Sequence, residues 1–329
     1  MKKKVAVIMG GFSSEFDISV KSAQTVIKHL PKNKYEIFPI EIRKNNWVYI
    51  DKNKNSFSID KNDFSVSVNN HKITFDVIFN AIHGTPGEDG AILPYFEMLG
   101  IPHTSAAFDK MALTFNKKNT IAVLRSYDVP TGASVFLHLN DKINTERIIQ
   151  KIGLPCFVKP NRAGSSYGIS KVYKKEELAG AVQKAFKEDK EIIIEEFLDG
   201  RELSIGVIKY KGKVKVLPIT EIISENDFFD FEAKYLGKSQ EITPAQIPEK
   251  IYKKAENTAQ RVYEILDLDG ISRAEYIIVE DTPYFIEINM IPGLTEASIF
   301  PQQALAAGLS LSELFDNAIE MALKKHKNE

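Results

Sequence analysis

The sequence contains a single cysteine, Cys156, among its 329 residues. One cysteine cannot form a disulfide within the chain, and this usage is typical of proteins in a reducing compartment. Cys156 lies in the stretch GLPCFVKP, which has the composition of a strand. We therefore expect its thiol to be buried and to serve only in packing.

Long hydrophobic runs and an excess of charge of either sign are absent as well. No stretch approaches the ~18 apolar residues of a membrane-spanning helix, and the apolar run after MKKK is too short for a signal peptide. The 43 Lys and Arg residues balance 44 Asp and Glu residues, for a net charge of −1. This balance gives no support to a nucleic-acid or membrane partner. We expect a cytoplasmic enzyme or binding protein.

The N-terminal third alternates buried strands with an amphipathic helix. KVAVIMG and FDVIFNAI are apolar runs of strand length. Between them, apolar and small residues recur at every fourth position from Ile18 to Leu30, which predicts a helix, and Pro31 ends it. This β-α-β order predicts an open parallel, Rossmann-like sheet in a domain of residues 1–104.

The rest of the chain predicts two further domains. Residues 105–190 alternate short strands and helices, as in a small α+β unit, and residues 191–329 begin with the strand-like runs EIIIEEFL, ELSIGVIKY and KVKVLPITEII. Within the third domain, residues 224–245 are polar and aromatic with little periodicity, which indicates a functional loop. The predicted fold class is therefore α/β and α+β, in three domains.

Two adjacent segments, SRAEYIIVEDTP and YFIEINMIPG, predict a hairpin with polar groups on one face. If residues 280–282 form a three-residue turn, Glu275 lies opposite Glu287 and Arg273 lies opposite Asn289. Opposed carboxylates repel each other unless a cation lies between them, and carboxylate and amide oxygens suit Mg²⁺. Alternatively, Arg273 merely neutralises an exposed glutamate pair. A two-residue turn would shift the register by one residue and remove the pairing.

The other face of the predicted hairpin is apolar. It would carry a wall of Ala274, Tyr276, Ile278, Tyr284, Ile286 and Ile288.

A glycine- and serine-rich loop predicts an anion site. The stretch VKPNRAGSSYGIS places Lys159 before Gly164, Ser165, Ser166 and Gly168. Glycines allow backbone N–H groups to turn toward an anion, and serines add donors. The order matches neither the Walker pattern nor the dinucleotide fingerprint. Alone, such a loop indicates ordinary turn chemistry, but with the upstream lysine and the downstream hairpin it predicts a nucleotide site.

An adenosine pocket is predicted in IIIEEFLDGRELSI. A strand edge can pair with the adenine rim, and a carboxylate can hold the ribose hydroxyls. The alternative for these glutamates is solvated surface charge. The candidate residues are Glu195, Glu196, Leu198 and Glu202.

The order of these motifs along the chain resembles that of the ATP-grasp enzymes. The motifs are the lysine with its Gly/Ser loop, EEFL with RE, FEAKYL, SRAE and EINMIPGLTEAS. The chain is more closely similar to the D-alanine–D-alanine ligase family. Its segments GGFSSEFDIS and HGTPGEDG resemble motifs that are particular to that family. The resemblance covers nearly the whole chain and implies a three-domain ATP-grasp architecture. It implies ligation of two D-alanines through an acyl phosphate for peptidoglycan precursors, with ATP as co-substrate. It also implies two Mg²⁺ ions, with Mn²⁺ as an alternative, and a homodimer.

The resemblance implies an ATP site with metals. Glu275, Glu287 and Asn289 would bind the Mg²⁺ ions, and Lys234 would reach the γ-phosphate. The complete implied set of ATP-binding residues is Lys117, Lys159, Ser166, Glu195, Glu196, Leu198, Glu202 and Lys234.

The resemblance also implies substrate and catalytic residues. Glu15 would receive the ammonium of the first D-alanine, with His83 nearby, and Ser298 would hold the carboxylate of the second. Arg273 and the Gly293 N–H would stabilise the oxyanion of the tetrahedral intermediate.

A hydrogen-bonded network is implied as well. Ser165, Tyr235 and Glu15 would close the loop 224–240 over the site and exclude water from the acyl phosphate.

Three positions depart from the family pattern. Phe16 stands where a basic residue or histidine is common, which affects the expectation for the first subsite. Glu275 replaces the commoner aspartate. MALTFNK differs from the usual motif, so the phosphate contact is assigned to Lys117 and not Lys118. Tyr235 favours dipeptide over depsipeptide formation.

Two alternative functions are compatible with these residues. One is a related ligase that joins D-alanine to D-lactate or D-serine, or joins other amino acids. The other is an inactive nucleotide-binding regulator, which is expected to have lost a metal ligand or Arg273; all of these residues are present.

Overall fold

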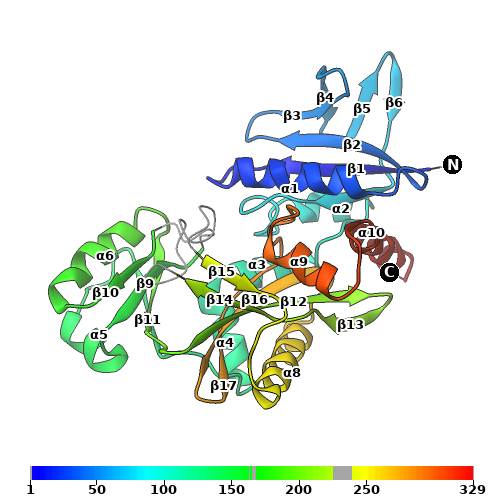
Figure 1. Ribbon diagram of the computed structural model, residues 1–329. Coiled ribbons are helices and arrows are strands. Elements are labelled where there is room, and N and C mark those ends of the chain that lie inside the picture. The colour runs from blue at the N-terminus through cyan, green and yellow to red at the C-terminus, as the bar shows by residue number, and fades with distance from the viewer. Residues whose placement is uncertain (1, 163, 165–167, 225–238, 329) are drawn as a thin grey trace.

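The computed structural model describes residues 2–162, 164, 168–224 and 239–328. These residues form three β-sheets, each with its own helices (Figure 1). Among the described helices, none has both the length and the apolar character needed to cross a bilayer.

The first sheet has the strand order β6-β5-β4-β3-β2-β1-β7. Its elements are β1 (Lys3–Gly10), α1 (Phe16–His29), β2 (Tyr35–Ile42), β3 (Trp47–Ile50), β4 (Ser56–Asp60), β5 (Ser65–Val68), β6 (His71–Ile73), β7 (Val77–Asn80) and α2 (Leu93–Met98). Strands β1 and β7 are parallel, as predicted. Strand β2, which no sequence pattern indicated, is also parallel to β1, and α1 is the crossover between these two strands.

The expectation of a wholly parallel first sheet is wrong, because β3 to β6 add to it in antiparallel order. Short turns join these strands, and a parallel pair would need a long crossover instead. Lys54, Asn69 and Asn70 adopt positive φ in the turns. In Figure 1 these strands extend away from the rest of the molecule. The sheet is therefore mixed.

The second sheet has the order β10-β9-β11-β8. Its elements are β8 (Ser134–His138), α5 (Thr145–Ile152), β9 (Cys156–Pro160), β10 (Ser170–Val172), the 3-10 turn Lys175–Glu177, α6 (Leu178–Ala185) and β11 (Glu191–Glu196). Because β11 is an inner strand here, the sheet extends past the expected domain edge at residue 190. Cys156 is fully buried in its core, as predicted, and burial raises the pKa of the thiol to about 11.

The third sheet has the order β15-β14-β12-β16-β17, with β13 paired to β12. Its elements are β12 (Arg201–Tyr210), β13 (Lys213–Val216), β14 (Thr220–Ser224), β15 (Ser239–Ile242), α8 (Glu249–Ile265), β16 (Ile271–Val279) and β17 (Thr282–Asn289). The segment KVKVLPITEII forms two strands instead of the predicted one, because Pro218 cannot donate to a ladder. Two helices of the middle segment, α3 (Phe108–Phe115) and α4 (Lys117–Ser126), lie beside this sheet (Figure 1).

The first and third sheets share a hydrophobic core through the C-terminal helices. Helices α9 (Ile299–Ala306) and α10 (Leu311–Asn328) lie between the two sheets in Figure 1. In one cluster, Ala23 and Val26 of α1 join Leu294, Phe300 of α9 and Phe315 of α10. The loop that follows β17 is thereby packed against α1, which positions the candidate site.

Candidate active site

The β16–β17 hairpin aligns its polar side chains as predicted, but through a different turn. Val279 pairs with Thr282, so the turn has two residues instead of the expected three. The predicted loss of pairing does not follow, because the register shifts between Glu275 and Tyr276. Such a bulge adds one residue to one strand and restores the alternation.

Beyond the bulge, the predicted pairs are confirmed. Glu275 lies opposite Glu287, and Arg273 lies opposite Asn289. The four polar groups therefore meet at the end of the hairpin, next to the loop that begins at Met290.

The predicted apolar wall is correct for β16 but only partly for β17. Ala274, Tyr276, Ile278 and Ile288 are buried as expected. Tyr284 and Ile286 are only partly buried, and Phe285 is 1% exposed in their place. The bulge causes this exchange, because a one-residue shift turns each side chain to the other face.

Two cations neutralise the paired glutamates. An Arg273 guanidinium nitrogen donates to Glu275 Oε1 over 2.9 Å, and Lys117 Nζ lies 3.3 Å from Glu287 Oε2. Glu275 is only 5% exposed. The alternative interpretation is therefore wrong about exposure, although Arg273 does neutralise Glu275. Lys118, by contrast, pairs with Glu191.

Lys159 and Glu195 form an ion pair in the second sheet. Lys159 lies on β9, Glu195 lies on the neighbouring β11, and Nζ is 2.9 Å from Oε2. Burial alone would lower the pKa of Lys159, but the negative charges of Glu195, Glu287 and Glu275 raise it above its ordinary value. Lys159 therefore stays charged although it is buried, because the carboxylates of the hairpin stabilise its positive charge.

The other adenosine-pocket candidates follow Glu195 along the chain. The carboxylate of Glu196 accepts a hydrogen bond from the Ala133 N–H over 2.6 Å. Leu198 and Glu196 both approach Gly132. Glu202 lies on β12 between its partners Ile222 and Ile277.

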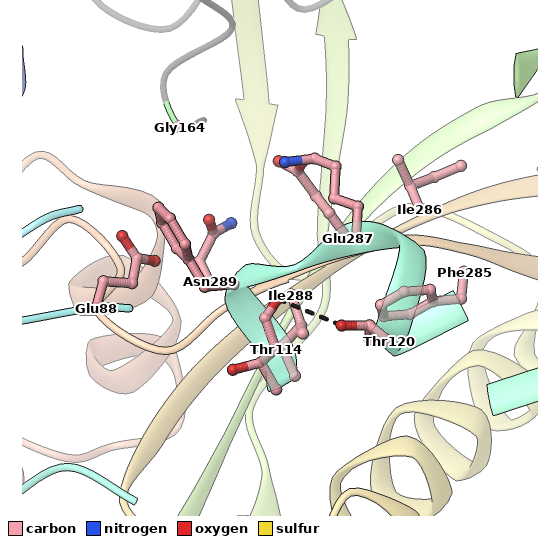
Figure 2. Close-up of a pocket in the computed structure, with 11 residues that line it drawn as sticks. Glu88, Thr114, Thr120, Gly164, Phe285, Ile286, Glu287, Ile288 and Asn289 are labelled. Atoms are coloured by element: carbon pink, nitrogen blue, oxygen red, sulfur yellow. Dashed lines mark hydrogen bonds and ion pairs between the residues drawn. The ribbon is translucent and has the colours of Figure 1, made fainter. Parts of the chain in front are cut away.

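A cavity joins the hairpin to the N-terminal unit. The adjoining cavity shown in Figure 2 shares four lining residues with this one, namely Glu88, Gly164, Glu287 and Asn289. The residues that line the cavity between the hairpin and the N-terminal unit are Glu15, His83, Glu88, Gly164, Arg273, Glu287, Asn289, Ile291, Pro292 and Gly293. The structure thus brings the predicted first-substrate residues together with the predicted oxyanion and metal residues.

Glu88 is a member of this cavity that the sequence analysis did not single out. It is 7% exposed, and its Oε2 accepts a hydrogen bond from the Gly84 N–H over 3.0 Å. Burial and the negative charge of Glu15 raise the Glu88 pKa to about 8. In Figure 2, Glu88 is drawn to the left of Asn289, and both residues line the pocket shown. Its only signal in the sequence is its place in HGTPGEDG.

His83 is 5% exposed, and its Nε2 lies 3.0 Å from Ser22 Oγ. Burial and the positive charge of Arg273 lower the pKa of His83 to about 4. The imidazole is therefore neutral at neutral pH, with one nitrogen as donor and the other as acceptor.

Ser298 and Gly293 lie in contact after β17. Ser298 Oγ is 2.7 Å from Thr295 Oγ1, and a Cβ on Gly293 would lie 2.9 Å from Ser298 Oγ. Glycine is needed here for this close approach. Ser298 is also the residue that precedes α9, so its backbone is held by the helix start.

Four predicted site residues lie outside the described part of the chain. They are Ser165, Ser166, Lys234 and Tyr235.

Comparison with known proteins places this geometry in a family. The models of the D-ala D-ala ligase N-terminus and C-terminus match residues 4–106 and 123–320. The chain belongs to the D-alanine–D-alanine ligase family. A D-alanine–D-alanine ligase of Flavobacterium johnsoniae is 58% identical over 321 residues, which cover 98% of this chain and 99% of the relative.

Solved structures of ligases share the fold over the whole chain. A D-alanine–D-alanine ligase of Bacillus anthracis complexed with ATP has a TM-score of 0.80 at 28% identity and covers 99% of both chains. A VanG D-Ala:D-Ser ligase of Enterococcus faecalis has a TM-score of 0.84 at 30% identity, covering 98% of this chain and 100% of that one. The mixed α/β fold with its curled sheets is thus that of ligases.

Proposed function

We propose that this protein is an ATP-dependent ligase that joins two D-alanines into D-alanyl-D-alanine for peptidoglycan precursors. The observation that carries the proposal is the single cavity that Glu15, His83, Arg273, Glu287 and Asn289 line together. It holds an anionic group for an ammonium, a cationic group for an oxyanion, and oxygen donors for a metal. The Flavobacterium johnsoniae relative, at 58% identity, carries the name of this activity.

The reaction has two steps. The γ-phosphoryl group of ATP moves to the carboxylate of the first D-alanine and gives an acyl phosphate and ADP. The amine of the second D-alanine then attacks the acyl carbon, loses a proton, and phosphate leaves the tetrahedral intermediate. Such chemistry needs positioning and charge neutralisation more than covalent catalysis.

Each described residue has a role that suits its surroundings. Glu15 binds the ammonium of the first D-alanine beside His83. Arg273 and the Gly293 N–H stabilise the oxyanion, because fixed donors in a buried site cost no reorganisation. Ser298, in contact with Gly293, binds the carboxylate of the second D-alanine.

Lys117 and Lys159 bind the phosphates of ATP. Both ammonium groups already lie among carboxylates at the hairpin and at β11, so each is held in place before the nucleotide arrives. Glu195, Glu196 and Leu198 surround the adenosine. The full proposed ATP site comprises Lys117, Lys159, Ser166, Glu195, Glu196, Leu198, Glu202 and Lys234, together with the closing residues Ser165 and Tyr235.

The hairpin fits a divalent cation. Glu275, Glu287 and Asn289 offer only oxygen ligands, which Mg²⁺ prefers, and no trio of acidic, His or Cys side chains gathers in the described residues. Substrate phosphates and water would therefore complete the coordination. We propose that these residues hold two Mg²⁺ ions, with Mn²⁺ as an alternative. When bound, the ions would neutralise charge on the phosphates.

The three sheets support a three-domain ATP-grasp architecture, with the first D-alanine subsite in the Rossmann-like unit 1–104. We place the central unit at 105–190, extended by β11, and the C-terminal unit over the remainder to 329. We further propose a cytoplasmic homodimer. The single cysteine supports the location, and the balanced charge supports the lack of a nucleic-acid or membrane partner.

The test is phosphate release from Mg·ATP by the purified protein, with products identified by mass. D-Alanine, L-alanine, and D-alanine mixed with D-lactate or D-serine are compared. Release with D-alanine alone, with D-alanyl-D-alanine as product, is expected. Release only with a mixed pair would make the protein a mixed-substrate ligase. No release with any of them, despite ATP binding, would overturn the ligase and favour an inactive regulator.

A further inference from the structure

One buried hydroxyl on α1 connects two parts of the site. Ser22 is fully buried, and its Oγ lies 3.0 Å from His83 Nε2. The same oxygen accepts a hydrogen bond from the Leu294 N–H over 3.2 Å. Residues separated by 61 and 272 positions in the chain thus meet at one atom.

Both partners of Ser22 belong to the cavity or adjoin it. His83 lines the cavity together with Arg273. Leu294 follows Gly293, whose N–H is assigned to the oxyanion, so the Leu294 hydrogen bond restrains the peptide plane between these two residues. Ser22 lies behind them and acts on the substrates only through them.

The hydrogen-bond inventory of the hydroxyl favours one direction for its contact with His83. A serine hydroxyl has one proton to donate and two lone pairs. The Leu294 N–H occupies one lone pair, and donation of the buried proton to Nε2 of His83 would give both the proton and the imidazole nitrogen a partner. A neutral imidazole that accepts at Nε2 carries its proton on Nδ1.

The surroundings keep this arrangement rigid. Leu294 packs in the same buried cluster as Ala23 and Val26 of α1. About two turns after Ser22 on the same helix, Lys28 and His29 both contact Glu296, at 2.6 and 2.8 Å. The helix therefore holds the 291–298 loop at a buried point and at an exposed one.

We propose that Ser22 is a positioning residue for ligation, whose hydroxyl fixes the His83 tautomer and ties the imidazole to the Gly293–Leu294 peptide. The inference rests on the proposed ligase function. It explains how the subsite of the first D-alanine, in the N-terminal unit, keeps a constant relation to the oxyanion donor in the C-terminal unit. Small displacements of such groups cost about 10²-fold in rate.

The matched control lies on the same helix. Ser19 is also fully buried, and its Oγ accepts from the Gly10 N–H and donates to the Ala81 carbonyl oxygen, at 2.8 and 2.7 Å. Ser19→Ala therefore removes the same number of buried hydrogen bonds without touching His83 or Leu294. It reports the structural cost of losing a helix hydroxyl.

The experiment measures kcat, KM for D-alanine and ATP affinity for Ser22→Ala, Ser22→Thr and Ser19→Ala. Ser22→Ala is expected to lower kcat/KM for D-alanine about tenfold to a hundredfold while ATP affinity stays within about twofold. Ser22→Thr, which keeps the hydroxyl, is expected to recover most of this loss. Equal kinetics for Ser22→Ala and Ser19→Ala would overturn the proposal.

A second measurement needs no kinetics and no Ser22 variant. The imidazole ¹⁵N resonances of wild-type His83, assigned with His83→Asn, report which nitrogen carries the proton. A protonated Nδ1 is expected, and a protonated Nε2 would refute the assignment. If the wild type made no dipeptide while the Nδ1 proton was observed, the ligase function would fail and the Ser22 geometry would stand.

Discussion

Glu88→Gln removes a carboxyl group that the fold buries beside another carboxylate. Burial and the charge of Glu15 raise the pKa of Glu88 from its ordinary 4.5 to about 8. Glutamine has nearly the same shape and stays neutral at every pH. The variant therefore imitates the protonated form and removes its titration.

The sign follows from proton linkage. Because the folded pKa lies above the unfolded one, the folded protein binds this proton more tightly. Its stabilising effect is complete below pH 4.5 and is lost as pH rises through about 8. In that interval the free energy of unfolding falls by about 1.4 kcal/mol per pH unit, or about 5 kcal/mol in all.

The assay is urea unfolding of wild type and Glu88→Gln at pH 6 and pH 8, without nucleotide or divalent cation. The stability advantage of the variant is expected to grow by about 2 kcal/mol between these pH values. Glu177→Gln is the control, because two backbone N–H groups lower the Glu177 pKa and its ionisation is complete at both pH values. An advantage of Glu88→Gln that is the same at pH 6 and pH 8 would refute the reasoning.

Three further predictions concern the ligands. A Cβ on Gly164 would lie 2.6 Å from Glu15 Oε2, so Gly164→Ala should displace that carboxylate and raise KM for D-alanine about tenfold; an unchanged KM in D-alanine titrations would contradict the contact. Lys117→Met should weaken ATP binding about tenfold by calorimetry, and Lys118→Met should change it less than about twofold, because Lys117 pairs with Glu287 whereas Lys118 pairs with Glu191; equal losses would count against this assignment. EDTA should abolish dipeptide formation and added Mg²⁺ should restore it, with Glu287→Gln needing a higher Mg²⁺ concentration; full activity in EDTA would exclude the metal role.

Local patterns in the sequence predicted much of the site because they depend on neighbouring residues. The alternation of side chains along β16 and β17 placed Glu275, Glu287, Arg273 and Asn289 on one face, and the structure confirms both pairs. The predicted length of the turn was wrong, because a turn shorter by one residue and a bulge of one residue together give the same pairing beyond the bulge. A single extra residue at Ile286 is invisible to a periodicity argument.

Properties that depend on distant residues could not be predicted this way. Strand β11 has the same apolar run whether it joins the second sheet or the third, so only the packing of Ile192 and Ile194 decides its place. Glu88 reads as one charge in a polar loop, and its raised pKa arises from burial near Glu15, 73 positions earlier in the chain. The antiparallel pairing of the four strands after β2 was likewise not predicted, because it depends on turns whose residues show no apolar periodicity.

The sequence by itself determined the kinds of groups that meet in this protein: carboxylates and an amide at a strand end, lysines near a glycine-rich loop, and strand and helix periods. These follow from side-chain chemistry and from local backbone geometry. Only the tertiary structure decided their distances and charge states. Contacts such as Ser22 with His83 and Leu294 join residues that the chain separates widely, and burial, which sets the pKa values of His83 and Glu88, is a property of the whole packed fold.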